Sequence, residues 1–287
     1  MYDVIKCFVT EMNMNQAVRT RKVKNTGVFF QYKTYSKTPD ALSARHCHDE
    51  YEILYITAGN GRCVIEGAEY PIHPNTIIFA PPFCYHSIEL LPDATYERYV
   101  LQFSESDLTQ KSETYLKALC DNLDGVGCYY GSDAISPAII SLFERFEYGE
   151  ALADEEKKEF SRLLASELVL LLSATSRQSI PRDEGELGAR VIKYLNENIH
   201  RDISLDKLAK KFFVSKYYLC RAFKKHNGTS VHGYINQKRV MYAKRLIESG
   251  ESASVAAYRV GFGDYSAFYR AYTKLIGRSP TAKEDKE

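Results

Sequence analysis

The pattern of apolar and polar residues predicts a β-rich part followed by helical parts. Between residues 27 and 104, short apolar and aromatic runs alternate with Gly, Pro and Asn turn signals at intervals of about ten residues, which is typical of an antiparallel barrel or sandwich. The runs are GVFFQYK, YEILYIT, RCVIE, TIIFA, HSIELL and RYVLQF. Residues 1–26 are mixed and predict an arm with a first short strand.

Residues 105–177 change to three-and-four apolar spacing, which predicts helices over 107–122, 136–148 and 154–176. The last helix should begin with Asp154 at its N-cap. Its middle is too apolar for a single core-facing stripe, with Leu163, Leu164, Leu168, Val169, Leu171 and Leu172. This helix is therefore either a dimer contact, which we expect, or buried entirely against the barrel. The polar stretch QSIPRDEG, residues 178–185, predicts a linker.

The last hundred residues contain an internal repeat with an offset of 49, which places Arg221 over Arg270 and Gly228 over Gly277. Each copy predicts a helix, a tight turn and a second helix. The first copy covers residues 205–211 and 215–225, and the second covers 253–260 and 264–276. Ser215 and Asp264 are placed to cap the second helices, and residues 187–199 add one more amphipathic helix.

Residues 229–249, between the copies, predict a spacer helix. Its apolar residues form one stripe, and the basic residues Lys238, Arg239, Lys244 and Arg245 are expected to stay accessible outside it. A helix of about twenty residues is roughly 30 Å long. That length is close to one turn of B-DNA, so the spacer could set two reading heads into successive major grooves.

At these residues the chain resembles a known family. The strings SLDKLAKKFFVSKYYLCRAFKKHNGTS and VAAYRVGFGDYSAFYRAYTKLIGRSP make residues 186–280 resemble the double helix-turn-helix domain of the AraC/XylS family of bacterial transcription regulators. The ending TAKEDKE departs from the family pattern, so a disordered tail is expected over 281–287.

Spacing within each recognition helix separates a core face from an outer face. Leu219, Phe223, Phe268 and Tyr272 should be buried. The outer face and the resemblance agree on the base-reading residues, which are Tyr217, Cys220, Arg221, Tyr265, Ser266, Tyr269 and Arg270. The residues expected to contact DNA phosphates are Lys216, Lys224, Lys225 and Lys274.

Histidines mark the β-rich part. His46, His48 and Glu52 stand at even positions and would face the same side of one strand. The strings H-x-H-x3-E-x6-G and P-x-F-x2-H, the latter ending at His86, resemble the two cupin motifs, although two expected glycines are missing, one of them at Phe83. The cupin resemblance implies a small barrel in which these four residues could hold Mn, Fe, Ni or Zn. We favour contact with an effector over a metal, and purely structural hydrogen bonding is the third alternative.

Charge separates the two parts. Residues 1–185 contain 18 Lys and Arg against 27 Asp and Glu, whereas residues 186–287 contain 20 against 10, a net charge of +10. A basic last third joined to an acidic remainder indicates a DNA-binding module. Seven cysteines without a C-x-x-C pair, together with the lack of a secretory or membrane-spanning apolar run, predict a reduced, cytoplasmic protein with no membrane association.

Together these features predict an α+β multidomain protein. It has a cupin-like effector-binding barrel (27–104), a helical dimerisation segment (105–177) and an all-α domain with two helix-turn-helix units (186–280). We expect a homodimeric, ligand-responsive transcription activator that is not an enzyme, binds double-stranded DNA, senses a sugar or related metabolite, needs no cofactor and contacts RNA polymerase. The alternative is a metal-dependent cupin enzyme with an appended DNA-binding domain.

Overall fold

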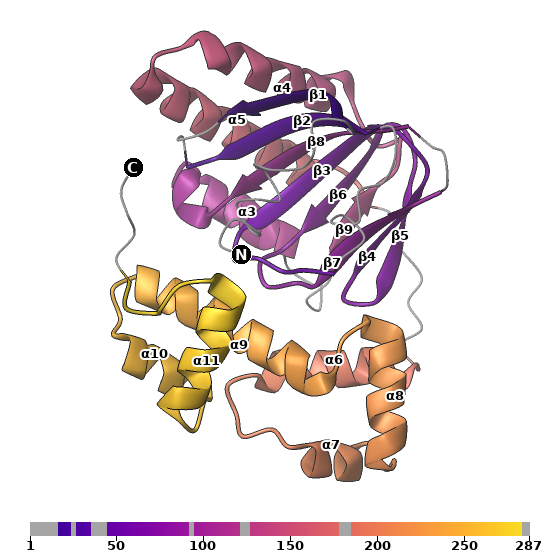
Figure 1. The fold of residues 1–287 in the computed structure, drawn as a ribbon. Coiled ribbons are helices and arrows are strands. Elements are labelled where there is room, and N and C mark those ends of the chain that lie inside the picture. The colour runs from indigo at the N-terminus through magenta and orange to yellow at the C-terminus, as the bar shows by residue number, and fades with distance from the viewer. Residues whose placement is uncertain are drawn as a thin grey trace. The chain divides into compact units, whose positions relative to one another are not determined.

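The computed structural model describes residues 17–23, 27–35, 45–91, 95–120, 127–177 and 185–282. The chain folds as two compact units (Figure 1): a β-rich one within residues 17–177, and a helical one formed by residues 185–282 together with residues 47–49. Residues 178–184 of the predicted linker, residues 1–16 and 24–26 of the predicted arm, and residues 283–287 of the predicted tail lie outside the described residues. No described helix combines the length and apolar character needed to span a membrane.

The β-rich unit contains two sheets with antiparallel pairing throughout the described strands. In spatial order, the six-stranded sheet comprises β1 (Ala17–Val23), β2 (Phe29–Tyr35), β8 (Tyr96–Phe103), β3 (Tyr51–Ala58), β6 (Thr76–Ala80) and β9 (Cys128–Tyr130). The three-stranded sheet comprises β5 (Ala68–Ile72), β4 (Gly61–Ile65) and β7 (His86–Leu90). The predicted antiparallel β-rich domain is confirmed.

Two of these strands were not predicted from the apolar runs. Strand β5 carries Glu69 and Pro71, which break its apolar character. Strand β9 has three residues and lies inside the predicted helical segment 105–177, between the helices expected over 107–122 and 136–148. It pairs with β6 and adds an edge strand to the sheet, although it lies outside the predicted barrel boundaries of 27–104.

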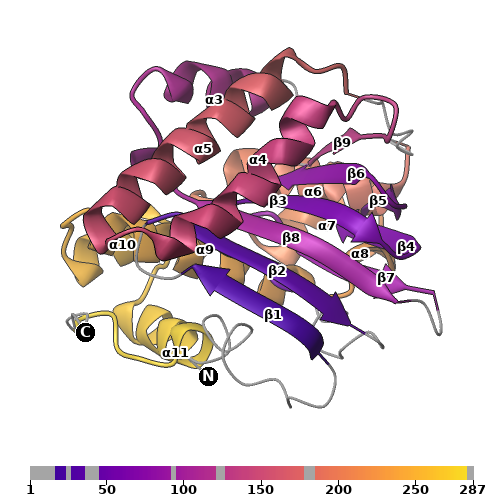
Figure 2. The same ribbon diagram turned by 90° about the horizontal axis from the view of Figure 1, so that it is seen from above.

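Three helices cover one face of the six-stranded sheet: α3 (Ser112–Cys120), α4 (Pro137–Tyr148) and α5 (Asp154–Ala174) (Figure 2). They meet the sheet in one apolar core, to which Phe30, Tyr55 and Leu101 contribute from the strands. Two expectations were wrong in detail. The short 3₁₀ helix η1 (Glu105–Asp107) precedes α3, which starts only at Ser112. The N-cap of α5 is Ala153 rather than Asp154. Asp154 lies in the first turn, where its negative charge interacts favourably with the positive end of the helix dipole.

The helical unit contains α6 (Leu187–Asn198), α7 (Leu205–Lys211), α8 (Lys216–Asn227), α9 (Val231–Glu248), α10 (Ala253–Arg259) and α11 (Tyr265–Ile276). Two helix-turn-helix units, α7–α8 and α10–α11, are joined by α9, as the repeat predicted. The repeat has a local cause at each helix end. Ser215 and Asp264 accept hydrogen bonds from the first turns of α8 and α11, and Gly228 and Gly277 end both helices with φ of 74° and 83°.

Candidate DNA interface and effector site

The second helix of each helix-turn-helix unit has a buried face and an outer face. Leu219 and Phe223 of α8, and Phe268 and Tyr272 of α11, are buried. On the outer face, Tyr217, Arg221, Tyr265, Ser266, Tyr269 and Arg270 are exposed, and Cys220 is half-buried. Arg221 and Arg270, which correspond in the repeat, thus have guanidinium groups available for bidentate pairing with guanine.

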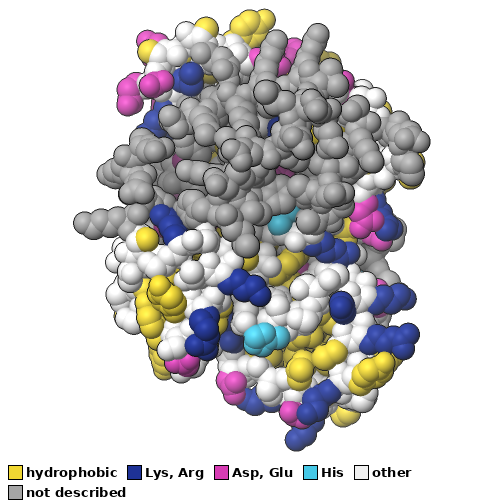
Figure 3. Space-filling view, in the orientation of Figure 1, with side chains coloured by type: hydrophobic (Ala, Val, Ile, Leu, Met, Phe, Trp, Pro, Cys, Tyr) yellow, Lys and Arg dark blue, Asp and Glu magenta, His cyan; other side chains and the backbone are white. Residues whose placement is uncertain are grey.

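Three of the four lysines proposed for phosphate contacts, Lys224, Lys225 and Lys274, are exposed and lie in the last turns of α8 and α11. The fourth, Lys216, is exposed but its Nζ lies 2.9 Å from Asp206 Oδ1, so a phosphate must compete with this carboxylate. Lys and Arg side chains outnumber acidic ones on the visible face of the helical unit (Figure 3). The basic charge of the last third is therefore carried on its surface.

Two exposed aromatic residues beside the outer face of α8 were not among the predicted site residues. Tyr218 is exposed next to Tyr217, and Phe213 is almost wholly exposed in the turn between α7 and α8. Phe213 has φ of 56°, a conformation that a bulky side chain adopts rarely. Phe212 and Phe213 are adjacent, and only Phe212 packs against the helical unit, stacking edge-on with Tyr194 at 6.0 Å.

The expectation that four basic residues of α9 stay accessible was wrong for two of them. Lys238 and Arg239 are buried, Lys244 is half-buried and only Arg245 is exposed. Arg239 donates from Nε to the carbonyl of Ile199 at 2.9 Å and from a terminal nitrogen to the carbonyl of Arg201 at 2.6 Å. Arg239 thus satisfies carbonyl groups at and after the end of α6, and its guanidinium also lies 5.9 Å from the ring centre of Phe262.

Phe262 belongs to the turn between α10 and α11, so Arg239 joins the end of α6 to the second helix-turn-helix unit. The preceding Gly261 has φ of 93°, and a Cβ atom there would lie 2.8 Å from the carbonyl oxygen of His200 and 2.9 Å from the Arg239 guanidinium. Close approach of the second turn to Arg239 therefore requires glycine. We infer that Arg239 holds the turn of the second helix-turn-helix unit against the end of α6 instead of binding DNA.

We expect Arg239→Met to destabilise the helical unit by about 2 kcal/mol, because charged hydrogen bonds to two carbonyls are lost. For a unit of this size the melting transition should fall by on the order of 10 °C. Scanning calorimetry of the full chain measures the change. Arg221→Met, on the exposed outer face of α8, is the matched control and should leave the transition where it is.

The four polar residues of the cupin-like motifs come together, but not as the spacing suggested. His46 and His48 precede β3 instead of lying on it, and His46 forms an isolated bridge with His86. The ring nitrogens of His46, His48 and His86 that lie closest together are all within 4.8 Å of one another. Glu52 Oε1 lies 3.6 Å from His86 Nε2, and Glu52 Oε2 accepts a 2.6 Å hydrogen bond from Gln102.

Phe83, which occupies the position of a missing motif glycine, has φ of 63°. The backbone therefore keeps the left-handed conformation that glycine adopts most easily, although the residue has changed. The shape of the motif is thus preserved around His86 even though the motif is incomplete.

The histidine cluster fits a divalent metal. Zinc–nitrogen bonds of about 2.0–2.1 Å place ligand nitrogens roughly 3–4 Å apart, so small side-chain rotations would bring all three imidazoles to one ion. His86 Nδ1 lies 3.0 Å from the carbonyl oxygen of Cys84, and a hydrogen bond there leaves Nε2 as the nitrogen turned toward Glu52. Imidazole and carboxylate groups are equally suited to hydrogen bonding with a polar effector.

Two basic residues of the β-rich unit were missed. Lys33 of β2 and Arg98 of β8 are buried and directly opposite each other in the sheet. Strand alternation could have predicted their direction. Phe30 and Leu101 pack toward the helices, so Lys33 and Arg98 face the opposite side of the sheet. Sequence alone favoured solvent exposure for such residues, since Lys and Arg are rarely fully buried.

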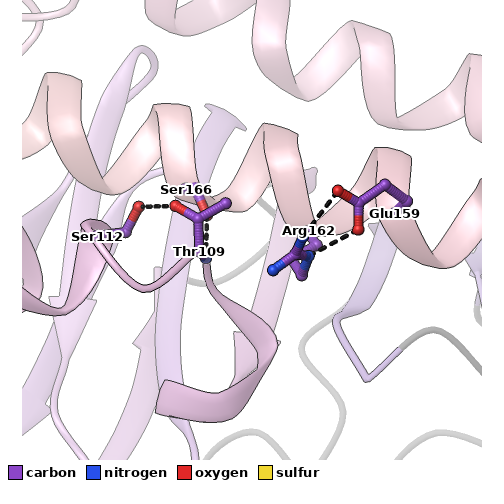
Figure 4. Close-up of polar contacts among 5 residues, drawn as sticks. All are labelled: Thr109, Ser112, Glu159, Arg162 and Ser166. Atoms are coloured by element: carbon purple, nitrogen blue, oxygen red, sulfur yellow. Dashed lines mark hydrogen bonds and ion pairs between the residues drawn. The ribbon is translucent and has the colours of Figure 1, made fainter.

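Helix α5 shows which of its leucines face outward. Leu164 is buried, and Leu171 packs partly against the core. Leu163 and Leu170, seven residues apart, are 50% and 39% exposed. Figure 4 shows Ser166 on the inner side of α5, accepting a 2.9 Å hydrogen bond from Thr109 N, and Arg162 bound through two nitrogens to Glu159.

Comparison with known proteins accounts for both units. Residues 32–173 match the family model of the AraC-like ligand binding domain, and residues 208–284 match that of a helix-turn-helix domain. The transcriptional activator RhaS of Escherichia coli is 24% identical over 247 residues, covering 85% of this chain and 88% of RhaS.

Solved structures of similar proteins include ToxT from Vibrio cholerae, which is 16% identical, with 89% of this chain and 96% of ToxT covered and a TM-score of 0.38. Another is the DNA-binding domain of AdpA in complex with a target DNA, which is 26% identical over 33% of this chain and 86% of that one, with a TM-score of 0.32. The two family models, which together span most of the chain, and the match to RhaS show that the chain belongs to the AraC family of DNA-binding, ligand-responsive transcription regulators.

Proposed function

We propose that this chain acts in the cytoplasm as a homodimeric transcription activator that reads DNA with α8 and α11, contacts RNA polymerase and responds to a small molecule in its β-rich unit. The duplicated helix-turn-helix unit supports this most directly, since equivalent arginines, Arg221 and Arg270, are exposed on both recognition helices. The spacer α9 has 18 residues and is therefore about 27 Å long. That length would place the recognition helices α8 and α11 in successive major grooves.

Base reading is assigned to Tyr217, Cys220, Arg221, Tyr265, Ser266, Tyr269 and Arg270, and it is tested on an operator selected from random duplexes. We expect Arg221→Ala and Arg270→Ala each to cost about 1–3 kcal/mol on that operator, because each removes a bidentate base contact. The two variants should relax base preference at separate positions about one helical turn apart. Competition binding against single-base variants of the operator measures both effects. Loss of preference at the same base pair in both variants would contradict the two-groove arrangement.

The effector is assigned to the β-rich unit, with His46, His48, Glu52 and His86 as polar contacts. A sugar or related metabolite fits such groups, because hydroxyls can both donate to Glu52 and accept from imidazoles. Binding controls transcription only if the effector prefers one arrangement of the dimer over another. No chemical step is required for that response, so we propose neither an enzymatic activity nor an essential cofactor. The named relative RhaS is likewise an activator.

A metal at the histidine cluster is the specific alternative, because three imidazoles converge there. If a metal were required, His48→Ala would lose it and destabilise the β-rich unit. We expect instead that chain purified without chelator contains well below one equivalent of Mn, Fe, Ni or Zn. His48→Ala should then raise the effector concentration needed for a response while DNA binding persists. Elemental analysis and DNA-binding titrations check the two expectations, and stoichiometric metal would contradict the first.

A further inference from the structure

Two buried cations lie side by side in the β-rich unit. Lys33 and Arg98 are cross-strand partners in the antiparallel β2–β8 ladder, and they are 5% and 8% exposed. Like charges directly opposite each other in a sheet are destabilising, and burial adds the cost of removing both from water. A buried pair that destabilises the fold indicates a role in binding.

The two side chains face away from the helices. Phe30 and Leu101, on alternate positions of the same strands, belong to the core beneath α3, α4 and α5. Burial raises the pKa of the Cys63 thiol, with Glu52 raising it further and Arg98 lowering it. Glu52 and Arg98 alternate with the core residues Ile53 and Leu101, and Glu52 lies 3.6 Å from His86 of β7, so both face the three-stranded sheet, in the interior between the two sheets.

Aromatic rings hold the cations in place. Lys33 Nζ lies 5.7 Å from the ring centre of Tyr35, and the Arg98 guanidinium lies 5.8 Å from that of Tyr96. The rings of Tyr35 and Tyr96 stack with centroids 6.1 Å apart. Cation–π contacts of this kind orient a charge without neutralising it.

Hydrogen-bonding capacity remains at this place. Among the described residues, no carboxylate lies within ion-pair distance of Lys33 or Arg98, although the buried Glu52 carboxylate acts on Arg98 from farther away. Arg98 Nε and Gln31 Nε2 are buried without a hydrogen-bond partner. Burial, and then the charge of Arg98, lowers the pKa of Lys33 to about 8, so the ammonium still dominates at neutral pH. Two positive charges, two unused donors and the Glu52 carboxylate, which raises the pKa of Arg98, therefore share one interior, and Lys33 and Arg98 together exceed the single negative charge of Glu52.

We propose that this interior binds an effector through an anionic group, a carboxylate or a phosphate, contacted by Lys33 and Arg98. The proposal rests on the β-rich unit being the effector site and narrows the effector class from neutral sugars to acids, such as a sugar acid or a sugar phosphate. A carboxylate or phosphate would pair with the Arg98 fork and the Lys33 ammonium together. It would also remove the repulsion between the two cations.

The test is the thermal stability of the full chain in sodium chloride, acetate or phosphate at equal ionic strength. We expect acetate or phosphate to raise the melting temperature of the β-rich unit by several degrees in the unaltered chain. Lys33→Met should abolish that rise. Lys117→Met, on the exposed side of α3, is the matched control and should retain it. Phosphate stabilises proteins in general, and Lys117→Met shows how large that general effect is.

A second expectation separates a ligand site from a structural pair. In sodium chloride, without acetate or phosphate, Lys33→Met should melt at a higher temperature than the unaltered chain, because a buried charge beside Arg98 is gone. Lys33→Arg, which keeps the charge, should retain the response to anions. The larger shift with acetate or with phosphate identifies the carboxylate or the phosphate as the preferred group.

Equal anion responses in the unaltered chain and Lys33→Met, or no response in either, would overturn the proposal. So would a Lys33→Met chain that melts at a lower temperature without anion. DNA binding by the full chain, measured in parallel, separates this failure from failure of the regulator assignment. An unaltered chain that binds its selected operator but shows no anion response would lose only the anionic effector.

Discussion

Between 50 and 200 mM salt, the affinity of the full chain for its operator is expected to fall by roughly a thousandfold or more. Three exposed lysines per protomer, Lys224, Lys225 and Lys274, lie at the ends of the recognition helices, and a dimer doubles their number. Six or more phosphate contacts release enough counterions to give a steep log–log dependence of affinity on salt. Fluorescence anisotropy with a labelled operator measures the slope. A flat plot would reject phosphate contacts as the source of affinity.

Individual lysines should contribute unequally to that slope. Lys225→Ala should reduce it by about one unit per protomer and weaken binding to all sequences alike. Lys216→Ala should change it less, because Lys216 already pairs with Asp206 and must break that contact to reach a phosphate. Arg221→Ala provides the contrast, since a base contact affects preference between sequences. Equal slopes for Lys225→Ala and the unaltered chain would remove Lys225 from the interface.

The second large effect is expected at α5. Leu163 and Leu170 stand two turns apart on its outer face, and the Glu159–Arg162 and Arg145–Glu167 pairs supply polar groups around them. An apolar centre with a polar surround is typical of a protein interface. Replacing both leucines with Glu should raise the dimer dissociation constant by a thousandfold or more, because two-fold symmetry places four unpaired carboxylates in the interface. Sedimentation velocity measures the change.

Leu164→Glu is the matched variant for the dimer prediction. Leu164 neighbours Leu163 in sequence but is buried in the core beneath the sheet, so its replacement should unfold the β-rich unit. The outer pair should leave the melting transition nearly unchanged while the protein becomes a monomer. A dimer that persists in the Leu163→Glu, Leu170→Glu variant would exclude this face of α5 from the interface.

Local signals in the sequence were sufficient for the helix-turn-helix units. Ser215 and Asp264 start α8 and α11, Gly228 and Gly277 end them, and apolar spacing selects Leu219 and Phe268 as core residues. Caps and left-handed glycines act within a few residues of their position, and one face of a short helix has a single surface to pack against. The repeat therefore determined the candidate DNA interface before any tertiary contact was known.

The effector site and the outer surfaces depended on contacts between distant segments. His46 and His86 are forty residues apart in sequence and meet through a β-bridge. Arg239 is buried because it donates a hydrogen bond to a carbonyl group at the end of α6. Leu164 is buried and Leu163 is exposed because only Leu164 faces the sheet. Lys33 and Arg98 become a buried pair through the register of β2 against β8. The residue types alone predicted exposed charges and interchangeable leucines. Pairing register and layer packing are set by the whole chain, so only the tertiary structure decided which of these side chains face the interior.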